Sequence, residues 1–275
     1  MVHAPGYTKP AEVAPGQPYH PMIHAFAATD TGPVRKNNED SCAVEDDLQV
    51  YVVADGMGGH SAGEVASRLA VESLVGFLRR SHGDNDVSWP YGLDRELSFH
   101  GNRLRTAINL ANRRIFRVAE SHDDYTGMGT TVVCALIADK RLVVGHVGDS
   151  RLYVWDGTTL KQLTQDDTWA AAMLGHENGD SELLTKHPMR HVLTNVLGAR
   201  ERTDAHVSEH DLRGGETLLL CSDGLYGALG EPNLAAIMRD VVEPEPLARR
   251  LVESALAAGA RDNVTALVVR YEAES

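Results

Sequence analysis

The segment Gln49-Val50-Tyr51-Val52-Val53-Ala54-Asp55-Gly56 joins a short β-branched and aromatic run to an acidic turn dipeptide. Such a run favours a β-strand and Asp-Gly favours a turn, so we predict a strand that enters a turn at Asp55. The arrangement recurs in Val147-Gly148-Asp149-Ser150 and in Cys221-Ser222-Asp223-Gly224. In Arg261-Asp262-Asn263-Val264 the aspartate precedes a strand instead, and Asn38-Glu39-Asp40 is a further acidic site.

The elements predicted around these segments come in blocks, strands beside strands and helices beside helices. Apolar residues at helical spacing predict helices over 63–80, 102–121, 232–241 and 245–258. Apolar runs bounded by turn residues predict strands over 23–28, 49–54, 130–137, 142–147, 151–155, 160–163, 205–210, 216–221 and 264–271. This order is typical of an α+β fold in which antiparallel sheets pack together and helices cover the outside.

Two segments differ from these elements. Residues 1–22 contain five of the eleven prolines and no apolar periodicity, which predicts a flexible or extended N-terminal tail. Residues 165–191 are polar, and a loop of that length inside a compact domain is usually functional, which predicts a flap. Its acidic residues either gate a site or are plain solvated loop. We expect the tail to be followed by one domain over 23–275.

The composition excludes several classes of protein. The chain has 26 basic and 39 acidic residues, and the net charge of −13 argues against binding to nucleic acid or to an anionic membrane. No apolar run approaches the ~18 residues of a membrane span, and the N-terminus does not resemble a signal peptide. Cys42, Cys134 and Cys221 form no CxxC pair, which excludes a disulfide scaffold and a thiolate zinc site and indicates a reducing, cytoplasmic location.

The repeated aspartates predict a metal site if they converge. A single strand-end aspartate is usually no more than a turn residue. Several carboxylates at one rim of a sheet fold would repel each other and raise each other's pKa unless a cation neutralised them. Oxygen ligands without cysteine or paired histidine favour Mg²⁺ or Mn²⁺. Two such ions ~4 Å apart suit phosphoryl transfer to water.

Short motifs follow one another in order along the chain: Arg35-Lys36-Asn37-Asn38-Glu39-Asp40, Asp55-Gly56-Met57-Gly58-Gly59-His60, Gly127-Met128-Gly129-Thr130-Thr131, Gly148-Asp149-Ser150-Arg151, His187-Pro188-Met189-Arg190-His191-Val192-Leu193-Thr194, Ser222-Asp223-Gly224 and Arg261-Asp262-Asn263. From about residue 23 to 272, their order and spacing resemble those of the bacterial PP2C (PPM) family of metal-dependent Ser/Thr protein phosphatases. The resemblance implies a PP2C-like four-layer αββα sandwich of two antiparallel β-sheets flanked by helices.

The resemblance also implies the ligands of two core Mn²⁺ or Mg²⁺ ions. Asp55 would bridge the two ions. Asp223 and Asp262 would complete the first ion. Asp40 and the carbonyl of Gly56 would hold the second ion.

Further positions are implied by the same motifs. Glu39 would lie in or near the water shell of the second ion, and Asp149 would hold a weaker third ion. Arg35 matches the arginine that grips the substrate phosphate, which suits a guanidinium fork; the alternative is a surface ion pair with Glu39. Eukaryotic relatives place a histidine general acid where this chain has Met57. His60 either takes that role or is only a helix-start residue.

The function implied is hydrolysis of phosphoserine and phosphothreonine in proteins by a water or hydroxide that bridges the two ions, without a covalent phosphoenzyme. We expect a cytoplasmic monomer whose partners are phosphorylated Ser/Thr proteins, with a Ser/Thr kinase as the family-based candidate, and no nucleic acid or membrane. The alternatives are a pseudophosphatase that only binds a partner and a two-metal hydrolase of nucleotides or small phosphate esters. The retained aspartates weigh against the first, and the lack of a P-loop against the second.

Overall fold

The computed structural model describes residues 22–59, 62–83, 88–174 and 187–272. Of the predicted tail over 1–22, only Met22 belongs to the described residues, and the first strand begins there. Residues 175–186 of the predicted flap also lie outside the described residues. No described helix is both long enough and apolar enough to cross a membrane.

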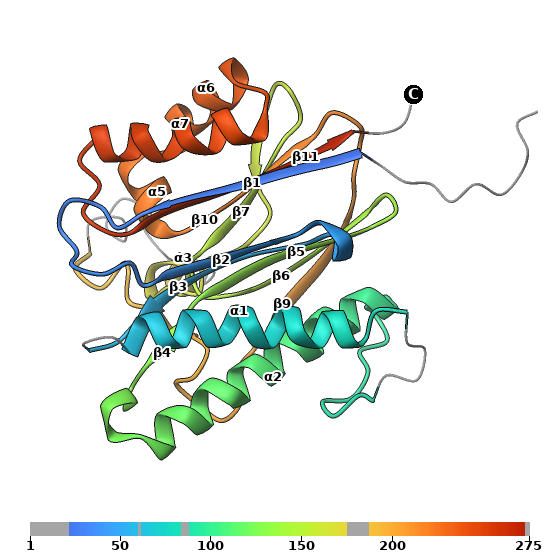
Figure 1. The fold of residues 1–275 in the computed structure, drawn as a ribbon, viewed down its shortest axis with the longest axis vertical. Coiled ribbons are helices and arrows are strands. Elements are labelled where there is room, and N and C mark those ends of the chain that lie inside the picture. Colours follow the sequence, from blue (N-terminus) through green and yellow to red (C-terminus); the bar gives the residue numbers. More distant parts are fainter. Residues whose placement is uncertain (1–21, 60–61, 84–87, 175–186, 273–275) are drawn as a thin grey trace, which may run out of the picture.

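Two antiparallel sheets form the centre of the molecule (Figure 1). The first sheet has the strand order β1 (Met22–Asp30), β11 (Val264–Glu272), β10 (Thr217–Cys221), β7 (Arg151–Trp155), β8 (Leu160–Gln162). The second has the order β2 (Asp40–Glu45), β3 (Val50–Met57), β5 (Val132–Ala138), β6 (Arg141–Val147), β9 (His206–Asp211), and the short β4 (Gly129–Thr130) pairs with the end of β3.

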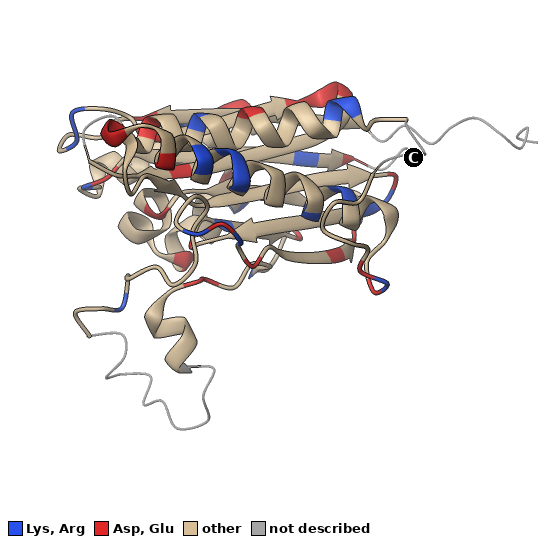
Figure 2. Ribbon diagram, turned by 90° about the horizontal axis from the view of Figure 1, so that it is seen from below, with Lys and Arg blue, Asp and Glu red and all other residues tan. Residues whose placement is uncertain are grey.

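Helices cover the outer face of each sheet, which confirms the predicted four-layer α+β sandwich (Figure 1). The second sheet is covered by α1 (Ala62–Arg80) and α2 (Phe99–Ser121), and the first by α5 (Asp223–Leu229), α6 (Glu231–Asp240) and α7 (Pro244–Ala257). Single 3₁₀ turns lie at η1 (Asp46–Leu48) and η2 (Asp123–Tyr125). The short α3 (Trp169–Leu174) has no charged residue and projects from the sandwich (Figure 2).

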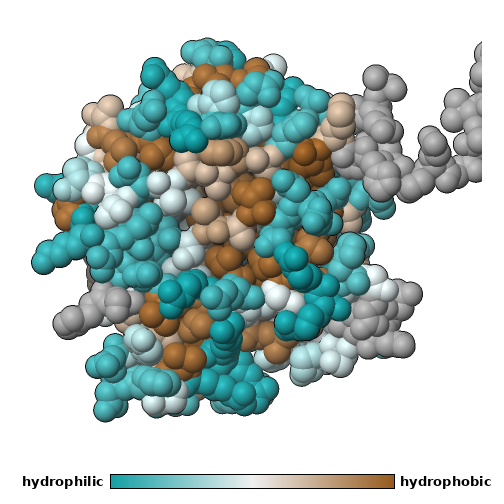
Figure 3. Space-filling model, viewed as in Figure 1, coloured by the Kyte–Doolittle hydropathy of each residue, from teal (hydrophilic) through white to brown (hydrophobic). Residues whose placement is uncertain are grey.

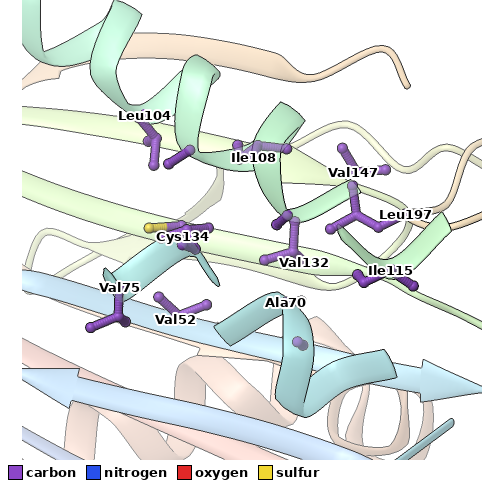
Figure 4. Close-up of a cluster of buried hydrophobic side chains, with 14 of the residues drawn as sticks. Val52, Ala70, Val75, Leu104, Ile108, Ile115, Val132, Cys134, Val147 and Leu197 are labelled. Carbon is purple, nitrogen blue, oxygen red and sulfur yellow. The ribbon is translucent and has the colours of Figure 1, made fainter. Parts of the chain in front are cut away.

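The central strands are apolar throughout because both of their faces are buried. In β3, the side chains of Val50, Val52 and Ala54 pack under α1 and α2, a cluster shown in part in Figure 4. The alternate residues Tyr51 and Val53 pack between the two sheets. This period of two explains why the strand carries an uninterrupted apolar run rather than an amphipathic pattern.

The core between the sheets approaches the surface along one edge. There β1 and β2 are the neighbouring edge strands of the two sheets. Apolar side chains gather over this part of the face in Figure 3, and partly buried residues of both strands pack against the inter-sheet cluster. They are Ile23, Ala25, Ala27, Cys42 and Val44.

Several local predictions need correction. The turn predicted at Asp55-Gly56 is wrong, because β3 continues to Met57 by pairing with β4. The predicted strand over 130–137 is divided between β4 and β5. The helix α5 and the strand β2 were not predicted. Two glycines in α5 lower its intrinsic helix propensity, so tertiary packing rather than local sequence stabilises it.

The contact between α2 and β6 depends on the absence of a side chain at Gly145. A Cβ there would lie 2.7 Å from Ile108 Cδ1 and 2.8 Å from Leu104 Cδ2. Both side chains are fully buried, so they have no free space to move into.

We therefore expect Gly145→Ala to lower the free energy of unfolding by about 1–3 kcal/mol, as overpacking in a dense core does. Gly227 is the matched control, because it lies on the exposed side of α5 and an added Cβ would meet no atom within 4 Å. Gly227→Ala should leave stability unchanged or raise it by up to about 1 kcal/mol. Urea unfolding of the three proteins measures this, and similar midpoints for both variants would contradict the packing argument.

Candidate metal centre

Strand pairing brings the predicted acidic residues to one end of the sandwich, the end at which the loop between β1 and β2 lies (left in Figure 1). Asp40 and Asp55 are directly opposite partners in β2 and β3, so their side chains leave the same face of the second sheet. Asp149 lies in the connection from β6 to β7, where the chain crosses between the sheets. Asp223 begins α5 one residue after β10 ends, and Asp262 precedes β11.

These side chains surround a cavity of about 240 Å³. Its acidic lining consists of Glu39, Asp55, Asp149, Asp223 and Asp262. The remaining lining residues are Arg35, Gly56, Met57, Gly58, Thr131, His191 and Leu193. Asp40 is 8% exposed and lies next to this group, with its charge acting on Asp55.

Burial and mutual repulsion raise the pKa values of these carboxyl groups. Burial, followed by the charge of Asp40, raises the pKa of Asp55 well above its usual range. Burial raises the pKa of Asp40 to about 6, and burial with the Asp223 charge raises the pKa of Asp149 to about 7. Burial and the Asp262 charge likewise raise the pKa of Asp223. A site that disfavours its own negative charges in this way favours a cation.

Unsatisfied oxygens mark the same place. Glu39 Oε1, Asp40 Oδ1 and Asp223 Oδ1 are buried and have no hydrogen-bond partner among the described residues. The second oxygen of Asp40, Oδ2, is anchored, because it accepts hydrogen bonds from Ser222 Oγ at 2.8 Å and Thr265 Oγ1 at 2.6 Å. A carboxylate with one oxygen held by hydroxyls and the other unpartnered is suited to bind a metal ion.

The donor set fits Mn²⁺ or Mg²⁺, because it offers carboxylate and carbonyl oxygens and no thiolate. As the described side chains lie, no three Asp, Glu, His or Cys groups enclose a common point closely enough to hold an ion. Asp262 Oδ2 instead accepts a hydrogen bond from Arg35 Nη2 at 2.6 Å. The chemistry of the site therefore suits the metals, and an ion at Asp262 would compete with Arg35 for that carboxylate.

Arg35, predicted to bind the substrate phosphate, lies in the wall of the acidic cavity. The alternative ion pair with Glu39 is not the one observed, since its partner is Asp262. Their hydrogen bond is the largest cause of the raised pKa of Arg35, so the guanidinium stays charged. His60 lies outside the described residues.

Backbone packing limits what can stand at Gly56. A Cβ at that position would lie 2.0 Å from the Gly63 carbonyl oxygen and 2.7 Å from the Glu39 carbonyl oxygen. The Gly56 amide also donates a hydrogen bond to that Glu39 oxygen at 3.0 Å. The strand end and the β1–β2 loop therefore meet backbone to backbone, and only glycine leaves room for the contact.

The structure identifies supporting residues to which the sequence motifs assigned no role. The Asn263 side chain donates to the carbonyl oxygens of Thr31 and Asn37 at 2.8 and 3.0 Å, and its Oδ1 accepts from the Glu39 amide at 2.9 Å. These bonds fix the loop that carries Arg35 to the start of β11. Thr131 Oγ1 accepts from the Asp55 amide at 3.1 Å. Asn263 and Thr131 stand inside the quoted motifs, which was their only sequence signal.

The described start of the predicted flap is tied to the fold. Asp166 forms a two-pronged ion pair with Arg151, at 2.9 and 2.7 Å. Asp167 accepts hydrogen bonds from the Gly148 amide at 3.0 Å and, through its other oxygen, bonds to His206 Nε2 at 3.0 Å. These two acidic residues are therefore neither plain solvated loop nor free ligands. The other predicted flap acids, Glu177, Asp180 and Glu182, lie outside the described residues.

An αββα sandwich with a carboxylate-lined cavity at one end defines a class of metal-binding proteins of mixed α and β structure. The sequence model of the family described as Protein phosphatase 2C matches residues 34–263. The Listeria welshimeri protein named Serine/threonine phosphatase stp is 33% identical over 254 residues, which are 90% of this chain and 95% of that protein. The Mycobacterium tuberculosis protein named Serine/threonine protein phosphatase PstP is 35% identical over 247 residues, which are 90% of this chain and 45% of PstP.

Solved structures agree with the sequence comparison. The crystal structure of Mycobacterium tuberculosis PstP/Ppp has a TM-score of 0.77 and 35% identity, over 91% of this chain and 99% of that one. A PstP catalytic domain solved in complex with two manganese ions has a TM-score of 0.75 and 32% identity, over 92% of this chain and 100% of that one. The chain belongs to the protein phosphatase 2C family.

The raised carboxyl pKa values predict how the metal-free protein responds to pH. A carboxyl group whose folded pKa exceeds its unfolded value stabilises the fold below the unfolded pKa, and that contribution is lost as pH rises through the folded pKa. For Asp149 this window runs from 3.8 to about 7. In EDTA, Asp149→Asn should therefore be more stable than the wild type at pH 8 by about 2 kcal/mol or more, with a smaller difference at pH 5.

Urea unfolding in EDTA at the two pH values measures this difference. Asp156→Asn is the control, because Asp156 is exposed and the Thr158 hydroxyl lowers its pKa. That variant should gain no stability at pH 8. If the free energy of unfolding of the wild type and of Asp149→Asn changed with pH in parallel, the pKa of Asp149 would not be raised by its surroundings.

Proposed function

We propose that the chain is a metal-dependent protein serine/threonine phosphatase that hydrolyses phosphoserine and phosphothreonine in proteins. In this proposal the nucleophile is a water or hydroxide held between two Mn²⁺ or Mg²⁺ ions, and no covalent phosphoenzyme forms. The observation that carries it is the cavity that combines a cluster of strained carboxyl groups with Arg35. Membership of the protein phosphatase 2C family, relatives named serine/threonine phosphatases and a relative solved with two manganese ions support it.

The proposed ligands are those that the resemblance to the family implies. Asp55 would be shared by both ions, and Asp223 and Asp262 would complete the first; all three line the cavity. Asp40 and the Gly56 carbonyl would hold the second. The unpartnered oxygens of Asp40 and Asp223 support this assignment, because each is buried and lacks a hydrogen bond.

Two further residues complete the proposed set. Glu39 acts through a water molecule, in keeping with its own unpartnered buried oxygen. Asp149, in the connection from β6 to β7, would hold a weaker third ion.

When bound, the divalent ions supply the positive charge that lowers the pKa of a water molecule and offsets the charge of the phosphate. The chain's own residues do the positioning. Arg35 now pairs with Asp262. With a cation bound at Asp262, Arg35 would instead pair with two oxygens of the phosphate, so each group would exchange one charged partner for another. Below their raised pKa values of about 6 and about 7, Asp40 and Asp149 hold protons that a bound cation would displace. His60 is the proposed proton donor to the leaving alkoxide.

The thiols are unsuited to covalent catalysis. Cys134 and Cys221 are fully buried, and burial raises the pKa of both thiols far above neutrality. Burial also raises the pKa of Cys42. A thiolate nucleophile needs the opposite environment, so the chain's residues favour direct attack by water.

We further propose that the protein acts as a cytoplasmic monomer on phosphorylated proteins, a Ser/Thr kinase among them.

Metal removal should separate this mechanism from a cysteine-based one. We expect EDTA to abolish hydrolysis of a phosphothreonine peptide and millimolar Mn²⁺ or Mg²⁺ to restore it, because the oxygen ligands bind these ions only modestly. Iodoacetamide should spare activity, since Cys134 and Cys221 are buried, partly buried Cys42 does not line the acidic cavity, and burial raises the pKa of all three thiols. Phosphate release measures both. Full activity of a metal-free preparation would contradict the proposal, and so would loss of activity of the metal-loaded enzyme on treatment with iodoacetamide alone. Faster hydrolysis of a nucleotide than of the phosphothreonine peptide would favour a different substrate class.

Loss of different proposed ligands should affect kcat and metal binding to different extents. Asp55→Asn removes the shared ligand, so we expect kcat to fall about a thousandfold or more, beyond the 10–100-fold typical of losing a residue that only orients a ligand. Asp149→Asn should lower kcat less and retain the two core ions. Calorimetric titration with Mn²⁺ counts the ions bound by each variant, and indistinguishable titrations would refute the assignment.

A further inference from the structure

The acidic cavity is small for a site that binds part of a protein. Its volume of about 240 Å³ is below the ~300–1,000 Å³ of sites that enclose drug-sized ligands. The residues that flank a phosphoserine or phosphothreonine advance by ~3.3–3.6 Å each in an extended chain. A protein substrate must therefore lay its flanking residues on the lip of the cavity, and the chemistry of that lip decides which flanking side chains are favoured.

One part of the lip is apolar. Leu193 lines the acidic cavity together with Met57, and it also lines a neighbouring cavity of about 580 Å³ together with Val196. Met57 and Val196 approach the same point, since a Cβ at Gly129 would lie 3.7 Å from Met57 Cγ and 3.5 Å from Val196 Cγ2. We call Met57, Leu193 and Val196 the apolar strip. Leu193 is the member of the strip that lines both cavities.

The apolar strip is accessible. Met57 is 42% exposed beside the cluster of carboxylates. Leu193 and Val196 are half-buried. Val192, next to Leu193 in the chain, is 47% exposed.

Backbone hydrogen bonds hold the apolar strip in place. Leu193 pairs with Thr168 in an isolated β-bridge, and the amide of Trp169 donates to the Val192 carbonyl at 2.8 Å. On the other side of Val196, the Leu197 amide donates to the Thr130 carbonyl at 2.9 Å and the reverse bond is 3.1 Å. The strip therefore offers a preformed surface, and little conformational entropy is lost when a ligand covers it.

We propose that the apolar strip binds a bulky apolar side chain of the phosphoprotein, within about two residues of the phosphorylated one. This rests on the proposed function, because it takes the phosphorylated side chain to occupy the acidic cavity. The three side chains of the strip carry no charge, so a charged flanking side chain laid on them would lose hydration without gaining a charged partner there. The charges around the strip are of both signs, since carboxylates line the acidic cavity while Arg200 and Arg202 line the neighbouring one. Covering exposed Met57 and half-buried Leu193 with an apolar side chain removes apolar surface from water.

The test compares phosphothreonine peptides that differ only in whether Leu, Ser or Glu stands at the two positions before or the two positions after the phosphothreonine. On the side that crosses the apolar strip, we expect Leu to raise kcat/KM about fivefold over Ser, with Glu below Ser. Leu193→Ser and Val196→Ser should each bring the ratio of Leu to Ser peptides to about one. Val242→Ser is the matched control, because Val242 is 47% exposed and follows α6 on the far helical layer, and it should keep the wild-type ratio.

p-Nitrophenyl phosphate has no flanking residues and reports the chemistry alone. Equal kcat/KM for Leu, Ser and Glu peptides in the wild type, with p-nitrophenyl phosphate hydrolysed, would overturn the inference and leave the proposed function standing; this comparison does not depend on the folding of any variant. Retention of the Leu preference in both strip variants would overturn it as well. Failure to hydrolyse any phosphopeptide or p-nitrophenyl phosphate with Mn²⁺ present would overturn the proposed function and this inference with it.

Discussion

Repulsion between buried carboxylates is the constraint on which the organisation of this protein depends. Asp40 and Asp55 are directly opposite each other in neighbouring strands, a pairing that is unfavourable for two like charges. The fold tolerates it because the β2–β3 ladder and the apolar faces of β3 are stabilised independently of the site. The strain appears as raised carboxyl pKa values and as buried oxygens without partners. The energy stored in this way becomes available to any cation that relieves the repulsion.

Neutral groups position the acidic residues without neutralising them. Ser222 and Thr265 hold one oxygen of Asp40, and Asn263 ties the β1–β2 loop to β11. A lysine or arginine at those positions would satisfy the carboxylates permanently and compete with the metals. The described cation in the cavity wall is Arg35, whose exposed ion pair with Asp262 is readily exchanged because solvent screens it. In the proposed function, the same arginine would pair with the phosphate when a metal ion competes for its carboxylate.

The cavity and its lip divide the recognition of a substrate between two kinds of chemistry. The charged interior suits a phosphate with its cations, which is common to every phosphoserine and phosphothreonine. The apolar strip adjoins it on a segment fastened to β4 and to the start of the predicted flap. Because a surface of this kind contacts flanking residues only, it discriminates between substrates without taking part in the chemical step.

The sequence by itself determined the α+β class, α1, α2 and most strands, because hydrophobic periodicity is a local property of the chain. It also determined the identity of the acidic residues, through motifs whose order is preserved. Tertiary structure alone decided that Asp55 lies inside a strand, since Gly56 and Met57 pair with β4, more than seventy residues later in the chain. It alone decided that Arg35 pairs with Asp262 rather than Glu39, and that Met57, Leu193 and Val196 form one surface. Contacts between residues so distant in sequence depend on how the sheets pack, and no local pattern records that.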